Sequence, residues 1–164
     1  MNPSSTNKNS LFRLILISLL SVAIAGLLGA CAGAPKRENL GMQVTATADV
    51  NPDMQGRPSP VILHIMVLNS TEQFNRLDYM SLTQPSGSAL GAELLSKNRL
   101  VLQPGESKAL PMELNPMTTD IGLVAGFRDI DNATWRKVVP ITQGDTKGIS
   151  ITLEQTQIVT TVSD

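Results

Sequence analysis

The chain has 164 residues, 41% of them hydrophobic, and its 13 Lys and Arg side chains nearly balance 14 Asp and Glu. This length is typical of a single domain with short appendages, and the balanced charge argues against a nucleic-acid-binding protein, which needs a basic face. The single Cys and single His exclude an internal disulfide framework, a Cys-based zinc site and a His-rich metal centre.

The chain begins with the pattern of an export signal. Its first residues are polar, carry Lys8 and Arg13 and include no acidic side chain, and residues 14–28 are uncharged. This apolar run of 15 residues is shorter than the roughly 20 that a membrane-spanning helix needs. A core helix or a short anchor is the alternative, but the run has no amphipathic period, so a core helix would have to be buried all round. The pattern predicts a signal peptide over residues 1–30.

The only Cys follows directly, in Leu28-Gly29-Ala30-Cys31. This segment resembles the lipobox of bacterial lipoproteins, in which the Cys is acylated and becomes the mature amino terminus. An incidental Cys in a signal peptide is the alternative. Two or more acyl chains hold a protein stably on a membrane, so lipid on Cys31 would be a firm tether. The next residue is Ala32 rather than Asp, which by resemblance to enterobacterial lipoproteins permits sorting to the outer membrane.

The residues after the lipobox predict a tether and then strands. Residues 31–41 are small and polar with Pro and Gly, which is typical of a flexible lipid-anchored tether, and the folded domain is expected over residues 42–164. Residues 42–48 alternate apolar and polar side chains, which predicts a half-buried strand. Residues 51–60 hold three Pro and one Gly and predict a loop. The run Val61–Leu68, VILHIMVL, predicts a central strand covered on both faces.

Two short helices are expected next. Ser70 and Gln73 have the spacing of a capping box and predict a helix over residues 70–82. Residues 88–97 predict a second helix, with two leucines one turn apart. Helices of this length are unstable alone, so they must pack on a larger element.

The remainder of the chain predicts strands. Pro111 cannot donate to a strand ladder, so its strand is expected at a sheet edge. Gly122 and Gly126 leave room on one face of a strand whose other face is apolar. The expected strands cover residues 99–103, 107–114, 121–128, 135–141, 148–153 and 157–162. About eight strands with two helices inserted early predict a mainly-β, two-sheet β-sandwich with a small helical annex.

The sequence contains little that suggests catalysis. His64 lies in the middle of a predicted strand, which favours a structural role. Residues 129–134 begin like a calcium loop, but Ala133 and Thr134 stand where an EF-hand needs an oxygen ligand and Gly. No Gly-rich phosphate loop follows a predicted strand. We therefore expect no enzyme, no metal site and no cofactor other than a covalent lipid on Cys31.

Several segments in order carry a family resemblance. They are the lipobox, the run Val61–Leu68, FNRLDY at 74–79, LVLQPGES at 100–107 and IGLVAGFRDIDNATWR at 121–136. Together they are similar to the outer-membrane lipoprotein of the type VI secretion system, the TssJ family, also called SciN/VasD-like. The chain departs from the frequent family pattern in having Phe127 where Tyr is common and His64 in the second strand.

The resemblance implies a transthyretin-like sandwich with extra helical elements, anchored in the outer membrane and facing the periplasm. It also implies a partner, the periplasmic domain of the IcmF-like inner-membrane protein TssM, in a complex that also contains TssL. By binding TssM, such a lipoprotein anchors the trans-envelope complex to the outer membrane. In the family the main contact is the loop between the first two strands. Here that loop corresponds to Asn51, Pro52, Asp53, Met54, Gln55, Gly56 and Arg57.

The residues of this loop fit a binding role. Asp53, Met54 and Arg57 offer an acid, an apolar contact and a base within one turn-rich segment. Met54 suits a protein contact, although it could equally be an ordinary exposed methionine. The competing hypothesis is a lipid-tethered periplasmic carrier of a small ligand on a transthyretin-like sandwich. A carrier needs an apolar pocket lined by side chains, whereas an adaptor does not.

Overall fold

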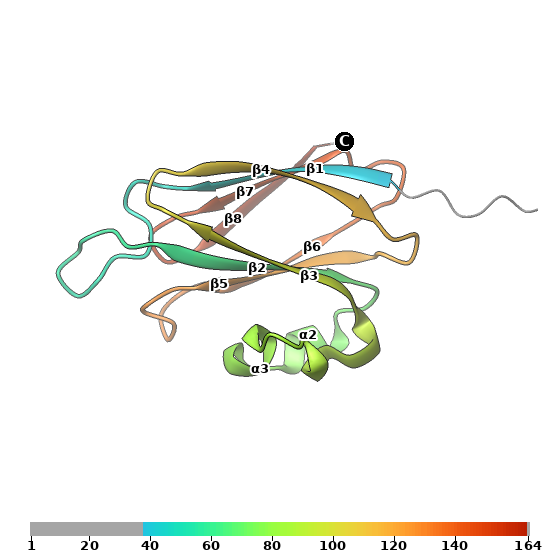
Figure 1. The fold of residues 1–164 in the computed structure, drawn as a ribbon, viewed down its shortest axis with the longest axis horizontal. Coiled ribbons are helices and arrows are strands. Elements are labelled where there is room, and N and C mark those ends of the chain that lie inside the picture. The colour runs from blue at the N-terminus through green and yellow to red at the C-terminus, as the bar shows by residue number, and fades with distance from the viewer. Residues whose placement is uncertain (1–37, 164) are drawn as a thin grey trace, which may run out of the picture. The chain divides into compact units, whose positions relative to one another are not determined.

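Two four-stranded sheets pack face to face in the part of the chain that the structure describes, residues 38–163 of a computed structural model (Figure 1). The strands are β1 (Glu38–Ala46), β2 (Val61–Leu68), β3 (Leu94–Leu102), β4 (Ser107–Leu114), β5 (Asp120–Gly126), β6 (Arg136–Pro140), β7 (Gly148–Leu153) and β8 (Ile158–Ser163). The order is β4-β1-β7-β8 in the first sheet and β3-β2-β5-β6 in the second. β1 pairs antiparallel with β4 and parallel with β7.

Alternate side chains of both sheets fill the space between them. In β1, Leu40, Met42 and Val44 are buried there, and the odd-numbered residues of β2, β5 and β7 belong to the same apolar cluster. A period of two is what a strand with one face on the core requires. The predicted mainly-β, two-sheet sandwich is therefore confirmed.

Three short helical segments cover the outer face of the second sheet, below it in Figure 1. They are α2 (Glu72–Arg76), α3 (Tyr79–Thr83) and the 3₁₀ segment η1 (Ser88–Glu93). These segments bring Phe74, Leu82 and Leu90 into a second apolar cluster with Met66 and Leu68 of β2. β2 is thus buried on both faces, as its continuous apolar sequence predicts.

Glycines in β5 make room for this helical annex. A Cβ on Gly122 would lie 2.6 Å from the ring of Phe74, and a Cβ on Gly126 would lie 2.8 Å from the hydroxyl of Tyr79. Real side chains do not approach so closely, so neither position accepts a larger residue without movement. The room predicted on this face of the strand is therefore filled by the annex.

The annex differs in detail from the two predicted helices. The helix expected over residues 70–82 breaks before Asp78, whose carboxylate accepts a 2.7 Å hydrogen bond from the backbone N–H of Ser81 and so begins α3 separately. The helix expected over 88–97 ends at Glu93, and β3 follows at once. Gly91, with φ 54° and ψ −128°, interrupts the helical backbone there.

The amino end of α2 is capped from a distant part of the chain rather than by the predicted capping box. The carboxylate of Glu93 accepts hydrogen bonds from the backbone N–H of Gln73 at 2.9 and 3.0 Å and from the hydroxyl of Ser70 at 3.2 Å. Negative charge near the amino end of a helix is stabilising. Glu93 therefore supplies the cap that local spacing assigns to Ser70 and Gln73.

The first strand begins four residues before the predicted start of the domain. Residues 38–41 belong to β1 and not to the flexible tether predicted over 31–41, because Leu40 continues the inward alternation of Met42. The remaining tether, Cys31 and the predicted signal peptide lie outside the described residues. Within residues 38–163, no helix is long and apolar enough to cross a membrane.

The edge position predicted from Pro111 is confirmed. Pro111 lies in β4, which is an edge strand of the first sheet and pairs only with β1 there. A missing N–H does no harm on the free side of an edge strand.

Candidate protein-binding loop

The connection between β1 and β2 projects beyond the end of the sandwich, at the left of Figure 1. Its residues 51–57, here called the 51–57 loop, are those that the sequence predicts for partner binding. They follow the carboxyl end of β1, whereas the tether joins the chain at the opposite end of the same strand.

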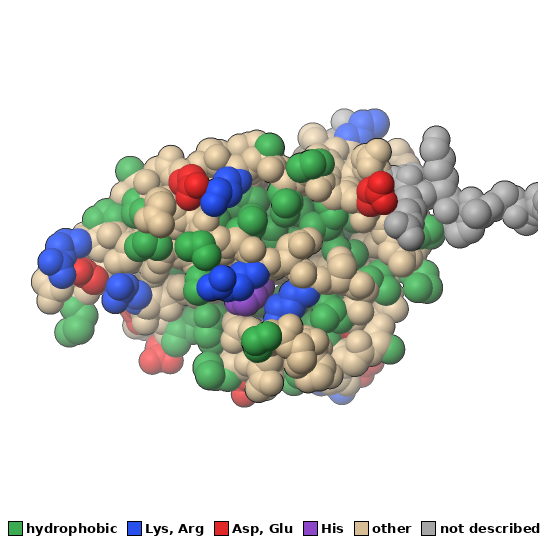
Figure 2. All heavy atoms as spheres, viewed as in Figure 1, with side chains coloured by type: hydrophobic (Ala, Val, Ile, Leu, Met, Phe, Trp, Pro, Cys, Tyr) green, Lys and Arg blue, Asp and Glu red, His purple; other side chains and the backbone are tan. Residues whose placement is uncertain are grey.

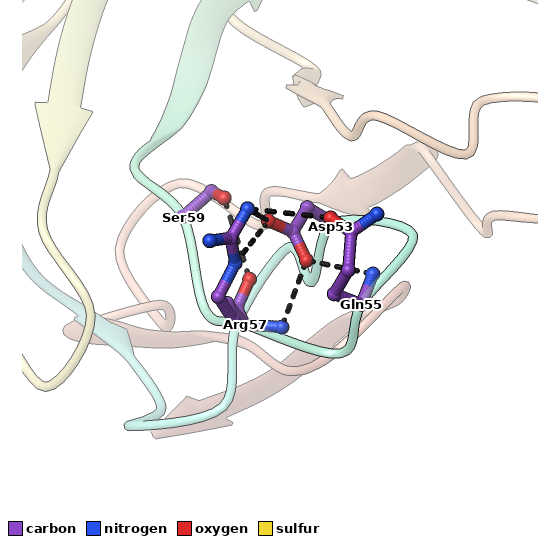
Figure 3. Close-up of polar contacts among 4 residues, drawn as sticks. All are labelled: Asp53, Gln55, Arg57 and Ser59. Atoms are coloured by element: carbon purple, nitrogen blue, oxygen red, sulfur yellow. Dashed lines mark hydrogen bonds and ion pairs between the residues drawn. The ribbon is translucent and has the colours of Figure 1, made fainter.

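Asp53 organises the 51–57 loop (Figure 3). One carboxylate oxygen accepts hydrogen bonds from the backbone N–H groups of Gln55 and Arg57, each at 2.9 Å. The other oxygen accepts from the guanidinium of Arg57 at 2.8 Å. Two backbone hydrogen bonds of 2.9 Å, Asp53 N–H to Arg57 C=O and Gly56 N–H to Asp53 C=O, close the turn. The loop is therefore ordered by its own residues.

The contacts with Arg57 also set the charge of the loop. The backbone N–H of Arg57, and then its guanidinium, hold the pKa of the Asp53 carboxyl below its usual range. The carboxylate is thus ionised at neutral pH and can accept all of these hydrogen bonds. Gly56 closes the turn with φ 75°, in the left-handed region that glycine adopts at little cost.

Met54 is the apolar residue of the loop. Its side chain is 99% exposed, although its neighbours on the loop are fixed by hydrogen bonds. A large apolar group held in water on an ordered loop is suited to burial by a partner protein.

Asn51 joins the loop to the sandwich. It is buried and has a left-handed φ of 51°, which asparagine tolerates better than most residues. Its side-chain N–H donates to the carbonyl of Pro60 at 2.7 Å, and its side-chain oxygen accepts from the backbone N–H of Arg128 at 2.7 Å. The sequence places Asn51 in the loop but does not predict this anchoring role, although an Asn directly before Pro is a turn signal that could have suggested it.

The loop borders an open hollow of about 710 Å³ that it shares with two other connections. Arg128 and Asp129 come from the connection between β5 and β6, and Thr156 comes from the turn between β7 and β8. Sequence reasoning missed these residues because only the fold brings them to the loop. In Figure 2, basic and acidic side chains lie together at this end. Most of the lining residues are polar or charged, whereas a small-ligand carrier needs a predominantly apolar pocket.

His64 lies in the middle of β2, 7% exposed, opposite Arg99 of β3. Burial lowers its pKa to about 4, and the positive charges of Lys97 and Arg99 contribute to this shift. The imidazole is thus neutral at physiological pH, which fits the structural role predicted for it. Among residues 38–163, no three His, Cys, Asp or Glu side chains come together as metal ligands would.

Comparison with known proteins gives one family. The model of the T6SS-SciN family, described as type VI secretion lipoprotein, VasD, EvfM, TssJ, matches residues 38–156. A comparison with curated protein sequences gave no significant match.

Solved structures with the same fold carry related descriptions. The T6SS lipoprotein TssJ1 from Pseudomonas aeruginosa is 30% identical, with a TM-score of 0.75 over 79% of this chain and 98% of that chain. Lip from Serratia marcescens, described as a membrane bound component of the type VI secretion system, is 23% identical, with a TM-score of 0.69 over 75% and 96%. A chain of a type VI membrane complex is 25% identical, with a TM-score of 0.67 over 76% and 98%.

Proposed function

We propose, from the premise that this chain belongs to the type VI secretion lipoprotein family, that it anchors the secretion complex to the outer membrane by binding the periplasmic domain of TssM. The observation that carries the proposal is the ordered 51–57 loop at one end of the sandwich, whose residues 54–57 are exposed. The complex would also contain TssL. An adaptor of this kind needs no catalytic step, so we propose no enzymatic activity.

The lipid anchor is the first part of the proposal. Cys31 would carry the covalent lipid, and Ala32 after it would permit transfer to the outer membrane. The tether then enters the sheet at the amino end of β1. Since β1 has nine residues, its carboxyl end lies about 30 Å further along the strand. A lipid and a partner can therefore engage opposite ends of one rigid domain.

The 51–57 loop is the second part. A partner that binds an already ordered loop loses little conformational entropy, and the bonds of Asp53 provide that order. Met54 offers apolar surface, and the hollow beside it offers Arg128 and Asp129 for polar contacts. This combination of an apolar contact with surrounding charge is common in protein–protein interfaces.

Removing residues 54–57 tests the loop. The lipoprotein purified in detergent should lose measurable binding to the periplasmic domain of TssM in a calorimetric titration. Its thermal unfolding should stay cooperative, because the deleted residues lie outside both apolar clusters. Unchanged affinity would show that another surface binds the partner.

Cys31→Ala tests the anchor. The variant should leave the membrane fraction, because Cys31 is the only Cys in the chain. If it still sediments with outer membranes when TssM is absent, the lipid anchor is wrong.

A further inference from the structure

Met117 is an exposed apolar residue at the end of the sandwich where β1 begins. The register of β1 with β4 pairs Glu38 with Leu114, so the start of β1 and the end of β4 lie side by side. Met117 follows three residues later in the β4–β5 loop, residues 115–119, and is 59% exposed. It therefore stands near the point where the tether joins the domain.

The β4–β5 loop is held in place, so this exposure is built into the fold. The side-chain nitrogen of Gln143 lies 2.6 to 3.2 Å from the carbonyl oxygens of Asn115, Pro116 and Thr118. The side-chain oxygen of Asn115 accepts the backbone N–H of Met117 at 2.9 Å. These bonds fix the backbone of the loop on both sides of Met117.

The short tether limits how far this end can move from a membrane. Glu38 follows Cys31 by seven positions, and a fully extended chain of that length spans at most about 25 Å. The opposite end of the domain, with the 51–57 loop, lies about 30 Å further away along β1. Of Met117 and Met54, Met117 is therefore the one placed to reach lipid.

We infer that the β4–β5 loop rests on the lipid surface and inserts Met117 at the boundary between headgroups and acyl chains. This inference rests on the proposed lipid anchor at Cys31. The loop itself has no charged residue, and the neighbouring β6–β7 connection, residues 141–147, has no net charge because it holds one acid, Asp145, and one base, Lys147. The contact is thus apolar in character and should depend little on salt.

The test compares Met117→Trp with Met54→Trp in the lipidated protein. Each variant is purified from bacterial membranes and reconstituted into phosphatidylcholine vesicles with or without brominated acyl chains, which quench nearby Trp fluorescence. The unsubstituted protein supplies the background of its single native Trp135. Both substituted residues are exposed, so both variants should fold, and thermal unfolding checks this.

We expect bromine to remove most of the fluorescence added by Met117→Trp and none of that added by Met54→Trp, at both low and high salt. If the protein floats with vesicles but Met117→Trp is quenched no more than the background, the membrane contact is wrong and the lipid anchor stands. If mass spectrometry shows no acyl chain on Cys31, the anchor and this inference both fail. Equal quenching of the two variants would also overturn the inference, because it would mean that the domain has no preferred end toward the lipid.

Discussion

The side-chain oxygen of Asn51 accepts a hydrogen bond from the backbone N–H of Arg128, 77 residues later in the chain, at 2.7 Å. This single bond links the 51–57 loop to the neighbouring connection that lines the same hollow. The buried side chain of Asn51 thus fixes the 51–57 loop relative to the β5–β6 connection.

Asn51→Ala should destabilise the protein by about 2–4 kcal/mol, because it leaves buried polar groups unpaired and puts alanine at a left-handed φ. Asn51→Gly loses the same side-chain bonds but tolerates that φ, so it should be more stable than the alanine variant by about 1 kcal/mol. Urea unfolding measures both. Equal stability of the two variants would mean that the backbone at this position relaxes.

Met54→Ser should weaken binding to the TssM periplasmic domain by about 5- to 30-fold, as expected for an apolar interface contact. Stability should not change, because Met54 is almost fully exposed. The matched control is Met80→Ser in α3, where the methionine is 72% exposed but lies in the annex. If both substitutions weaken binding equally, the annex also belongs to the interface.

Glu93→Ala should cost about 1–2 kcal/mol of unfolding free energy, because α2 loses its cap and the negative charge at its amino end. The control is Glu72→Gln, which removes an exposed ion pair with Arg76 and should cost less than about 0.5 kcal/mol. Urea unfolding of the two variants gives the comparison. A cost for Glu93→Ala no larger than that of the control would contradict the capping role.

His64 should make stability depend on pH. Its pKa is about 4 in the folded protein and 6.5 without the fold, so below pH 6.5 the unfolded chain takes up a proton that the folded chain does not. The contribution of His64 to the free energy of unfolding is therefore full above pH 6.5 and is lost as the pH falls toward 4. Between pH 7 and 5 the wild type should lose about 1–2 kcal/mol through this residue.

His64→Leu removes the titration, and no other histidine is present to mask the result. Urea unfolding at pH 7 and pH 5 should show a smaller loss in the variant than in the wild type. The same loss in both proteins would assign the pH dependence to other groups.

Elements with a strong local pattern were predictable from the sequence. The bounds Val61–Leu68, Ser107–Leu114 and Gly148–Leu153 match β2, β4 and β7, because continuous or alternating apolar residues are bounded there by turn residues. Pro111 indicated an edge strand because it has no backbone N–H, and Gly122 indicated close packing because it has no side chain. Such features depend only on the chemistry of the neighbouring chain.

Features that depend on distant residues were not predictable. The spacing of Ser70 and Gln73 suggested a local cap, but Glu93 arrives from 20 residues away and takes that place. Arg128 reaches the candidate loop only because β5 lies beside β2. The sequence assigns residues 38–41 to the tether because the segment up to Gly41 is small and polar with Pro and Gly, whereas pairing with β4 extends the strand. In each case tertiary contacts outweighed the local signal.

The place of β1 within its sheet has a mechanical consequence. The strand is hydrogen-bonded along both sides, to β4 and to β7, and in the chain it lies between the tether and the 51–57 loop. A pull between lipid and partner would run along this strand and load its inter-strand bonds in shear, all at once. Had the tether and the loop joined the same end of β1, the same pull would peel the bonds apart one by one. The proposed lipid-anchored adaptor would thus be loaded in the direction in which this strand resists force best.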